Sequence, residues 1–265
     1  MQELHIGEND AGQRFDKYLK KLLAEAPGSF VYKMLRKKNI TLNSKKADGT
    51  EKLSCGDEVK LFLSDETYEK FRAKSKTVMP EAFSGSEKTL RQLKVLYEDA
   101  DILIINKPSG MLSQKARPED VSANEYILSY LLREGALTEE EMRTFRPSVC
   151  NRLDRNTSGI LIAGKTLKGL QEMSKALKER TIQKYYRCVV KGEVLREDYL
   201  KGWLVKDERE NKVTVSTVKP KSADAAPIET AYRPIWTGGG YTGLEVHLIT
   251  GRSHQIRAHL ASIGH

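Results

Sequence analysis

A carboxylate set among cations is the feature of this sequence that most suggests chemistry. Residues 151–159 (NRLDRNTSG) directly precede the apolar segment 160–163. A polar turn before a buried strand can aim a side chain into a cleft, and the neighbouring arginines favour the ionised form of Asp154. An ionised carboxylate can act as a nucleophile or a base. Taken alone, the same run also fits a surface turn with local ion pairs.

Two histidines and two arginines lie close together in residues 250–260 (TGRSHQIRAHL). A metal site at His254 and His259 is one interpretation of this pattern. The stretch contains no carboxylate or cysteine, and a spacing of five residues suits chelation from one helix poorly. We therefore expect no metal ion here.

A third stretch, residues 184–192 (KYYRCVVKG), places Tyr186 in a run of alternating aromatic and aliphatic residues. Such alternation is common in ordinary strands. By itself it indicates a strand and no particular chemistry.

Residues 29–46 carry six basic side chains and no acidic one. Most runs of this kind are solvated helix faces. A basic helix that continues into a strand can instead place its side chains along a nucleic-acid backbone. The basic residues are Lys33, Arg36, Lys37, Lys38, Lys45 and Lys46. We favour phosphate binding because of the motifs farther along the chain.

The composition points to a globular protein with a polyanionic partner. The formal net charge is +9, and its excess lies before residue 81 and after residue 150. Basicity of this size favours binding to nucleic acid. No apolar run approaches the roughly 18 residues of a membrane span, and no secretory signal is visible. The three cysteines show no metal-ligand or disulfide pattern, so we expect a cytoplasmic protein.

Residues 1–64 are predicted to form a small α+β domain. Apolar residues in 14–24 recur on one face of an amphipathic helix. Ser29 is the expected N-cap of a second helix that ends at Lys38. Two strands are expected at 40–43 and 59–63.

A linker over residues 65–90, flexible or extended, is predicted to connect this domain to a second one spanning 91–265. Strands outnumber helices in the second domain, and consecutive strands can pair directly. We therefore predict an α+β fold with a mixed, mainly antiparallel sheet and flanking helices. The expected strands are 93–97, 102–105, 160–163, 185–190 and a hairpin of 231–236 with 244–249, and the expected helices are 123–133 and 166–177.

Four sequence blocks, in this order, resemble those of the RluA-type family of pseudouridine synthases. They are residues 106–110 (NKPSG), 152–159 (RLDRNTSG), Lys184-x-Tyr186, and 250–259 (TGRSHQIRAH). The resemblance covers essentially the whole chain. The N-terminal unit is similar to a small RNA-binding domain shared with a ribosomal small-subunit protein, which many ribosomal-RNA members of the family carry in the same position.

Two departures from the family pattern are visible. The family commonly has His at the position of Asn151, which we interpret as altered loop packing or RNA contact. Relatives usually continue past the position of His265 with Pro and further strands, so we expect the C-terminal end of the domain to be truncated.

The resemblance implies roles for individual residues. Asp154 would be the catalytic carboxylate and Arg257 its ion-pair partner. Tyr186 would lie against the uracil ring and help to remove a proton from the carbon that joins the sugar. Arg152 would fill the space that the flipped base leaves. The other residues expected to contact RNA are Arg155, Arg252, His254, Lys33, Arg36, Lys37 and Lys38.

The implied reaction breaks the bond between ribose and a uracil nitrogen, rotates the base, and joins the sugar to a ring carbon. No redox change occurs and no outside group enters, so we expect no cofactor and no metal. A carboxylate can attack the sugar or the ring, or remove a ribose proton. The sequence leaves these three routes open.

Structured RNA is the expected partner, because the target base must leave its stack at a cost of a few kcal/mol that is smallest in loops and bulges. We expect large-subunit ribosomal RNA, with transfer RNA as an alternative substrate. A non-catalytic RNA-binding or ribosome-assembly protein is the alternative from another class. The presence of Asp154, Tyr186 and Arg257 together argues against it. With no coiled-coil or other assembly signal, we expect a monomer without a membrane partner.

Overall fold

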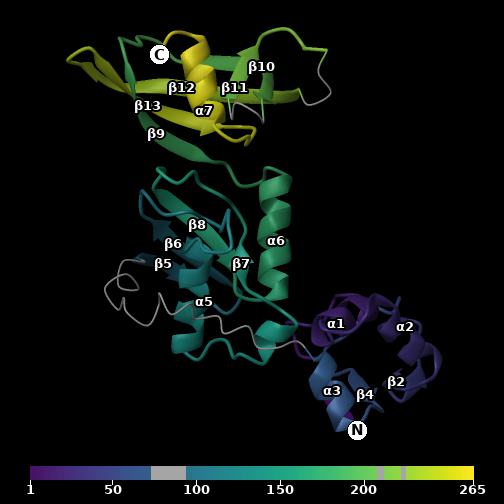
Figure 1. Ribbon diagram of the computed structural model, residues 1–265. Helices are drawn as coiled ribbons and strands as arrows, with labels where there is room; N and C mark the ends of the chain where they lie inside the picture. The colour runs from purple at the N-terminus through teal and green to yellow at the C-terminus, as the bar shows by residue number, and fades with distance from the viewer. Residues whose placement is uncertain (73–93, 208–211, 222–224) are drawn as a thin grey trace. The chain divides into compact units, whose positions relative to one another are not determined.

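The computed structural model describes residues 1–72, 94–207, 212–221 and 225–265 (Figure 1). The chain forms two compact units, Met1–Lys175 and Ala176–His265, and each is described by itself. The first unit contains two separate hydrophobic clusters, one within residues 4–71 and one within residues 95–163. Within the described residues, no helix combines the length and the apolar character that crossing a membrane requires.

The N-terminal part of the first unit packs three helices against a small sheet (Figure 1). The sheet has the order β1-β4-β2-β3 and its pairs are antiparallel. Phe15 and Leu19, on the apolar face of the predicted first helix, are fully buried. The elements are β1 (Gln2–His5), α1 (Phe15–Leu22), α2 (Gly28–Arg36), β2 (Ile40–Leu42), β3 (Lys45–Lys46), β4 (Glu58–Leu61) and α3 (Asp65–Phe71).

The second helix differs from its prediction at both ends. It begins at Gly28, with Pro27 in the N-cap position, so Ser29 is not the cap. Proline suits a helix start because its fixed φ is compatible with the first turn. A backbone N–H at this position would have no partner within the helix, so its absence costs no hydrogen bond. The helix ends at Arg36, and Lys38 adopts a left-handed conformation with φ of 58° that turns the chain into β2.

The predicted linker was wrong in its first residues, which form α3. Ser64 caps this helix by accepting a hydrogen bond from the Thr67 amide at 3.2 Å. Tyr68 is buried in the N-terminal cluster, and Phe71 packs on Phe30 with ring centroids 4.7 Å apart. A helix of only two turns is too short for its apolar period to stand out. The predicted linker from residue 73 onward lies outside the described residues.

The second part of the first unit is a four-stranded antiparallel sheet with the order β5-β6-β8-β7. Its strands include those predicted at 93–97, 102–105 and 160–163. The predicted helix at 123–133 is α5, which begins with a capping box of Ser122 and Glu125. The elements are β5 (Lys94–Glu98), β6 (Ile102–Lys107), α5 (Ala123–Arg133), the 3-10 helix η2 (Glu141–Arg143), β7 (Ser148–Val149), β8 (Gly159–Gly164) and α6 (Leu167–Lys178).

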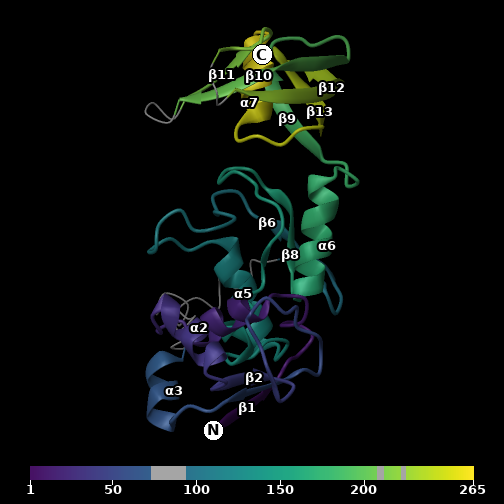
Figure 2. The same cartoon turned by 90° about the vertical axis from the view of Figure 1, so that its right-hand side faces the viewer.

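The second unit is a five-stranded antiparallel sheet with the order β11-β10-β12-β13-β9 (Figure 2). Helix α7 lies across one face of this sheet (Figure 1). The predicted hairpin is confirmed as the pair β12 and β13. The elements are β9 (Tyr185–Lys191), β10 (Asp198–Asp207), β11 (Lys212–Ser216), β12 (Ala226–Gly238), β13 (Tyr241–Leu248) and α7 (Gln255–Ser262).

The predicted α+β class is confirmed, and the named strands of the described residues pair antiparallel. The strands of the predicted second domain lie in two sheets, one in each unit. The domain division at residues 64 and 91 itself remains a prediction.

Candidate active site

Asp154 lies in the loop that joins β7 to β8. The two strands pair through Ser148 with Gly164 and Val149 with Ala163, so the loop connects two neighbouring antiparallel strands of one sheet. The Asp154 carbonyl accepts a hydrogen bond from the Thr157 amide at 3.0 Å, which closes a tight turn. The Asp154 side chain is exposed, whereas the preceding Leu153 is buried. This alternation presents the carboxylate on the outside of an anchored turn.

Ser113 holds the residue directly before Asp154. Its buried hydroxyl donates to the Leu153 carbonyl at 2.8 Å and accepts from the Leu153 amide at 2.9 Å. Both backbone polar groups of Leu153 are therefore satisfied by one side chain that lies 40 residues away in the sequence. A buried, doubly bonded anchor of this kind fixes where the Asp154 backbone lies.

Lys107 holds the same loop directly after Asp154, at the Arg155 carbonyl. The side chain is fully buried, and its ammonium group donates to three carbonyls, those of Pro108, Met111 and Arg155, over 3.0, 2.7 and 3.2 Å. Three bonds use all the donors of an ammonium group. Burial lowers the pKa of Lys107, and the negative charge of Asp154 partly opposes this effect. Lys107 is thus both a backbone clamp and a nearby positive charge for Asp154.

The rest of the 106–110 block adds two more bonds to this loop. The Gly110 amide donates to the Arg155 carbonyl at 2.9 Å, and the Ser109 hydroxyl donates to the Asn156 carbonyl at 2.9 Å. Two of the four sequence blocks that carry the resemblance are therefore in direct contact. The first block acts as the support of the second.

Asn151, where the family commonly has His, extends the sheet with its side chain. Its amide nitrogen donates to the Ile160 carbonyl at 3.1 Å, and its oxygen accepts from the Ile162 amide at 2.8 Å. The neighbouring Cys150 amide donates to the Ile162 carbonyl at 2.7 Å. Of the two interpretations given for this departure, these contacts favour loop packing.

Tyr186 lies on β9 in the second unit, on the face of the sheet that α7 covers. It is half-buried and packs against the cluster that contains Val246 and Leu260. Ile256 of α7 packs against the same cluster. Tyr186 and the helix that carries Arg257 are therefore on one side of one sheet.

Two buried polar residues, Gln255 at the start of α7 and His259 in its last turn, anchor this helix. Gln255 donates through its amide nitrogen to the Glu229 carbonyl at 3.0 Å and to the Thr230 hydroxyl at 2.9 Å, and its oxygen accepts from the Thr250 hydroxyl at 2.9 Å. His259 contacts the Thr230 hydroxyl through Nδ1 at 2.9 Å. Burial lowers the pKa of His259 and favours the neutral ring. His259 is therefore an anchor in the core of the second unit.

Arg252 and Arg257 point outward from the same segment. Both are exposed, and Arg257 Nη1 lies 3.4 Å from Nδ1 of His254. His254 precedes α7 with a left-handed φ of 57°, an uncommon conformation for a non-glycine residue. Within the described residues, no group of three or more His, Cys, Asp or Glu side chains is arranged to hold a metal ion. Within residues 250–260, Gln255 and His259 are therefore buried and hold the segment in place, whereas Arg252 and Arg257 are exposed.

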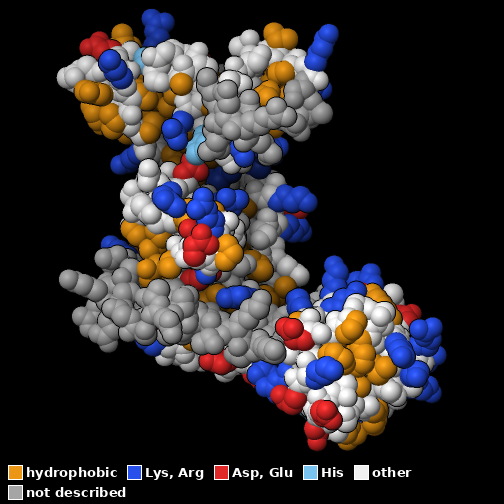
Figure 3. All heavy atoms as spheres, in the orientation of Figure 1, with side chains coloured by type: hydrophobic (Ala, Val, Ile, Leu, Met, Phe, Trp, Pro, Cys, Tyr) orange, Lys and Arg blue, Asp and Glu red, His pale blue; other side chains and the backbone are white. Residues whose placement is uncertain are grey.

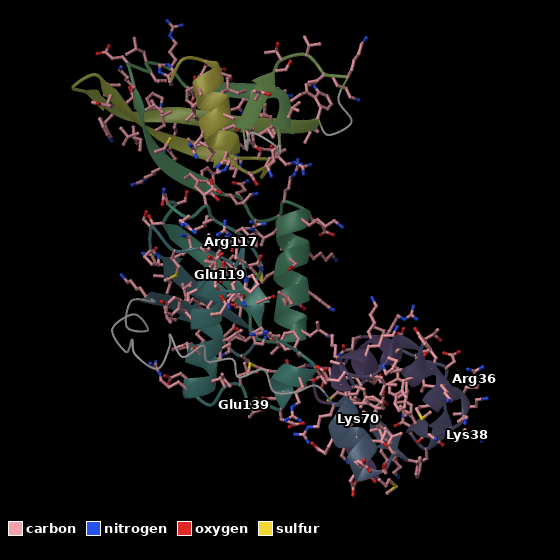
Figure 4. The ribbon with its side chains drawn as sticks, in the orientation of Figure 1. Arg36, Lys38, Lys70, Arg117, Glu119 and Glu139 are labelled. Atoms are coloured by element: carbon pink, nitrogen blue, oxygen red, sulfur yellow. The ribbon has the colours of Figure 1, made fainter. Side chains whose placement is uncertain are left out.

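The six basic residues within 29–46 of the small domain are all exposed. Lys and Arg side chains gather along the edge of the domain that α1 and α2 form (Figure 3). Arg36 and Lys38 point away from the domain body (Figure 4). Arg152 and Arg155, in the Asp154 loop, are exposed as well. These positions suit phosphate contacts, and the RNA contacts themselves remain predictions.

The structure thus groups the predicted site residues by unit. Arg152, Asp154 and Arg155 share the first unit, whereas Tyr186, Arg252, His254 and Arg257 share the second. Sequence reasoning missed the supports: Ser113 and Gln255 were given no role, and Lys107 was quoted only within its block. The signal in the sequence that could have indicated these supports is that each is a polar residue next to an apolar segment.

Comparison with known proteins identifies the family. Residues 101–262 match the family described as RNA pseudouridylate synthase. The chain belongs to this family. It is an RNA pseudouridine synthase of the RluA type, an isomerase, as the sequence blocks predicted.

Individual relatives of this synthase extend the match over the whole chain. Ribosomal large subunit pseudouridine synthase C of Vibrio vulnificus is 31% identical over 271 residues, which cover 100% of this chain and 78% of the relative. The protein of the same name from Escherichia coli is 30% identical, covering 98% and 76%. The structure of Human RNA Pseudouridylate Synthase Domain Containing 4 superposes with a TM-score of 0.53 and 19% identity. The match covers 66% of this chain and 66% of the human chain, and it shows a shared fold.

Proposed function

We propose that this pseudouridine synthase isomerises specific uridines in large-subunit ribosomal RNA. The observation that carries the proposal is the similarity over the full chain to relatives named for the ribosomal large subunit. The basic residues on the exposed surface of the small domain support a large, folded RNA as substrate.

In the proposed reaction Asp154 supplies the essential negative charge. Ser113 and Lys107 bond to the residues on either side of Asp154, so the backbone that carries the carboxylate is already fixed before the substrate binds. Arg257 is proposed to form a charge-assisted pair with Asp154 and to orient it. A planar guanidinium, projecting from a helix whose first turn is pinned by Gln255, suits this task.

Tyr186 is proposed to stack on the uracil ring and to help remove the proton from the ring carbon that joins the sugar. Arg152 is proposed to occupy the space that the flipped base vacates. Its exposure next to Asp154 supports this role. Arg155, Arg252 and His254 are proposed to contact the RNA around the target base.

We further propose that the synthase acts as a monomer in the cytoplasm, without a cofactor or metal. The reaction changes neither redox state nor composition, which supports the absence of a cofactor. Activity that persists in the presence of a metal chelator, at protein concentrations where sedimentation shows a single chain, would agree with this proposal. Dependence on an added metal or on a dimer would contradict it.

The direct test is pseudouridine mapping on defined RNAs. The purified chain is incubated with transcripts of large-subunit ribosomal RNA and, in parallel, with small-subunit ribosomal RNA and transfer RNA. Pseudouridines are then located by carbodiimide labelling and primer extension. We expect modification at one or a few uridines of the large-subunit transcript only. Modification of transfer RNA alone would overturn the ribosomal assignment, and binding without modification of any RNA would favour a purely RNA-binding protein.

A further inference from the structure

The five-stranded sheet of the second unit has a face that does not carry α7. Side chains alternate between the two faces of a strand, and Tyr186, Val190 and Val246 point toward the cluster under α7. The opposite face, here called the outer face, carries Tyr185, Arg187, Val189, Gly243 and Trp236. Tyr185 is 58% exposed, Val189 is 61% exposed and Trp236 is 49% exposed. Large apolar and aromatic groups are rarely left open together without a partner.

Trp236 lies on this face near the turn end of the β12–β13 hairpin. The β12–β13 register shifts between Pro234 and Trp236, so Ile235 is an extra residue and both Ile235 and Trp236 are turned outward. Trp236 is paired across the sheet with Gly243, and a Cβ added to Gly243 would lie 2.1 Å from the indole nitrogen. One side of the indole therefore rests on the Gly243 backbone, which leaves the ring exposed above the sheet.

An open pocket of ≈ 370 Å³ lies beside this ring. Gly243 is paired with Val189 on the next strand, so the pocket runs across three strands. Its lining is Arg187, Cys188, Val189, Ile235, Trp236 and Gly243. The pocket has the size to hold a planar group of nucleobase dimensions against the indole.

A row of aromatic rings begins at Tyr185 of β9, two residues before Arg187 and four before Val189, which both line this pocket. Tyr185 stacks on His247 with ring centroids 4.7 Å apart and an angle of 17° between the planes. Across the same row, beyond Ala231 on β12, lies Tyr199 of β10, which is 46% exposed. The outer face thus offers two separate platforms on which flat rings can stack.

Charged side chains lie between Trp236 and the row that begins at Tyr185. Glu245 is flanked by Arg233 at 2.7 Å and by Arg187 at 3.9 Å, so one carboxylate faces two guanidiniums. Both arginine side chains are largely exposed, at 59% and 79%. The row therefore carries a net positive charge beside the stacking platforms. Aromatic rings next to exposed arginines are the combination that binds single-stranded nucleic acid.

We propose that the outer face binds an unpaired segment of the RNA substrate, with a base stacked on Trp236 and the flanking phosphates on Arg187 and Arg233. This inference rests on the proposed function in taking RNA as the ligand. It adds a binding surface that is separate from the face bearing Tyr186. Charge complementarity favours RNA over a protein partner, since the net positive row lies beside the apolar pocket.

The test uses the fluorescence of Trp236 itself. The chain has two tryptophans, and the variant Trp203→Phe leaves Trp236 as the sole one. Titration with a short oligouridylate should quench this fluorescence, and the apparent affinity should fall as salt is raised. A duplex RNA of the same length should quench much less, because its bases are already stacked. Absence of quenching by the single strand would overturn the proposal.

Substitutions test whether the contact matters for the substrate. Trp236→Ala should weaken oligouridylate binding about tenfold, while Trp236→Phe should retain most of it. Arg187→Ala should reduce the salt dependence of binding. Tyr97→Ala is the matched control, because Tyr97 of β5 is 50% exposed and lies in the other unit. If Trp236→Ala lowers the melting temperature, Gly243→Ala provides a second variant, since a methyl group there displaces the ring.

The outcomes separate this inference from the proposed function. If the wild-type chain modifies ribosomal RNA and Trp236→Ala binds oligouridylate like the wild type, the outer-face proposal fails while the proposed function stands. If quenching and its loss occur but no RNA is modified, the binding surface stands and the proposed function fails. A dimer that dissociates on Trp236→Ala, without an effect on RNA binding, would show that the face holds a second copy and would overturn the proposal.

Discussion

Ser113 and Leu153 are joined by two hydrogen bonds of 2.8 and 2.9 Å, both through one serine hydroxyl, immediately before the proposed catalytic Asp154. We expect Ser113→Ala to leave the Leu153 amide and carbonyl without partners in a buried place. Each such group costs about 1–3 kcal/mol. For the two groups together, the free energy of unfolding measured by urea denaturation should fall by about 2–6 kcal/mol, and pseudouridine formation should slow. Ser109→Ala, which removes an exposed hydroxyl that bonds to Asn156, should lower it by less than about 0.5 kcal/mol. Equal losses in the two variants would contradict the anchor.

Lys107 is expected to control the rate through the position of the Asp154 loop. Lys107→Met keeps the buried stem but removes the three bonds to the Pro108, Met111 and Arg155 carbonyls. A displacement of about 1 Å can lower catalysis about a hundredfold. We therefore expect a loss of that order in the rate constant of pseudouridine formation, measured under single-turnover conditions. Lys115→Met, at an exposed lysine of the same unit, is the control. A wild-type single-turnover rate constant in a folded Lys107→Met protein would rule out this role.

Position 151 is expected to require an amide side chain, which can both donate and accept a hydrogen bond. Asn151→Asp keeps the acceptor for the Ile162 amide but replaces the donor to the Ile160 carbonyl with an oxygen. Two oxygens then face each other, and we expect a loss of about 1–2 kcal/mol in the free energy of unfolding. Asn156→Asp, at an exposed position of the same loop, should change stability little. If both substitutions have the same small effect, the side-chain pairing with β8 does not contribute.

His259 should make the stability of the second unit depend on pH. Burial holds its pKa in the folded chain below the ordinary value of 6.5, so the unfolded chain binds the proton more readily. The free energy of unfolding should therefore fall as the pH drops below 6.5 and level off beneath the folded pKa. Urea denaturation across this range measures the slope. His259→Gln has no titrating ring and should flatten this part of the profile; an unchanged slope would exclude His259 as its source.

Elements with long, regular patterns were predictable from the sequence. The helix at 123–133 and the β12–β13 hairpin combine clear periodicity with a cap or a glycine turn. Helix α3 was missed because it is two turns long and highly charged, and its burial depends on Tyr68 and Phe71 meeting the small domain. Such tertiary contacts leave no local signal in the sequence.

The candidate site shows the same division. Asp154 stands out because its block has a characteristic order of residues, and Arg257 because its segment is dense in cations. Ser113 could not be found in this way, since its role is a side-chain contact to a backbone 40 residues away. The outer face was missed as well, because it needs the pairing of β9, β13 and β12 to bring Val189, Gly243 and Trp236 together.

The most direct test of the account is pseudouridine formation by Asp154→Asn on a large-subunit ribosomal RNA transcript, with RNA affinity measured on the same preparation. Glu119→Gln is the matched control, because it neutralises an exposed carboxylate of the same unit (Figure 4). We predict that Asp154→Asn forms no detectable pseudouridine and keeps its RNA affinity, while Glu119→Gln behaves like the wild type. Pseudouridine formation by Asp154→Asn at the wild-type rate would contradict the central role of this carboxylate.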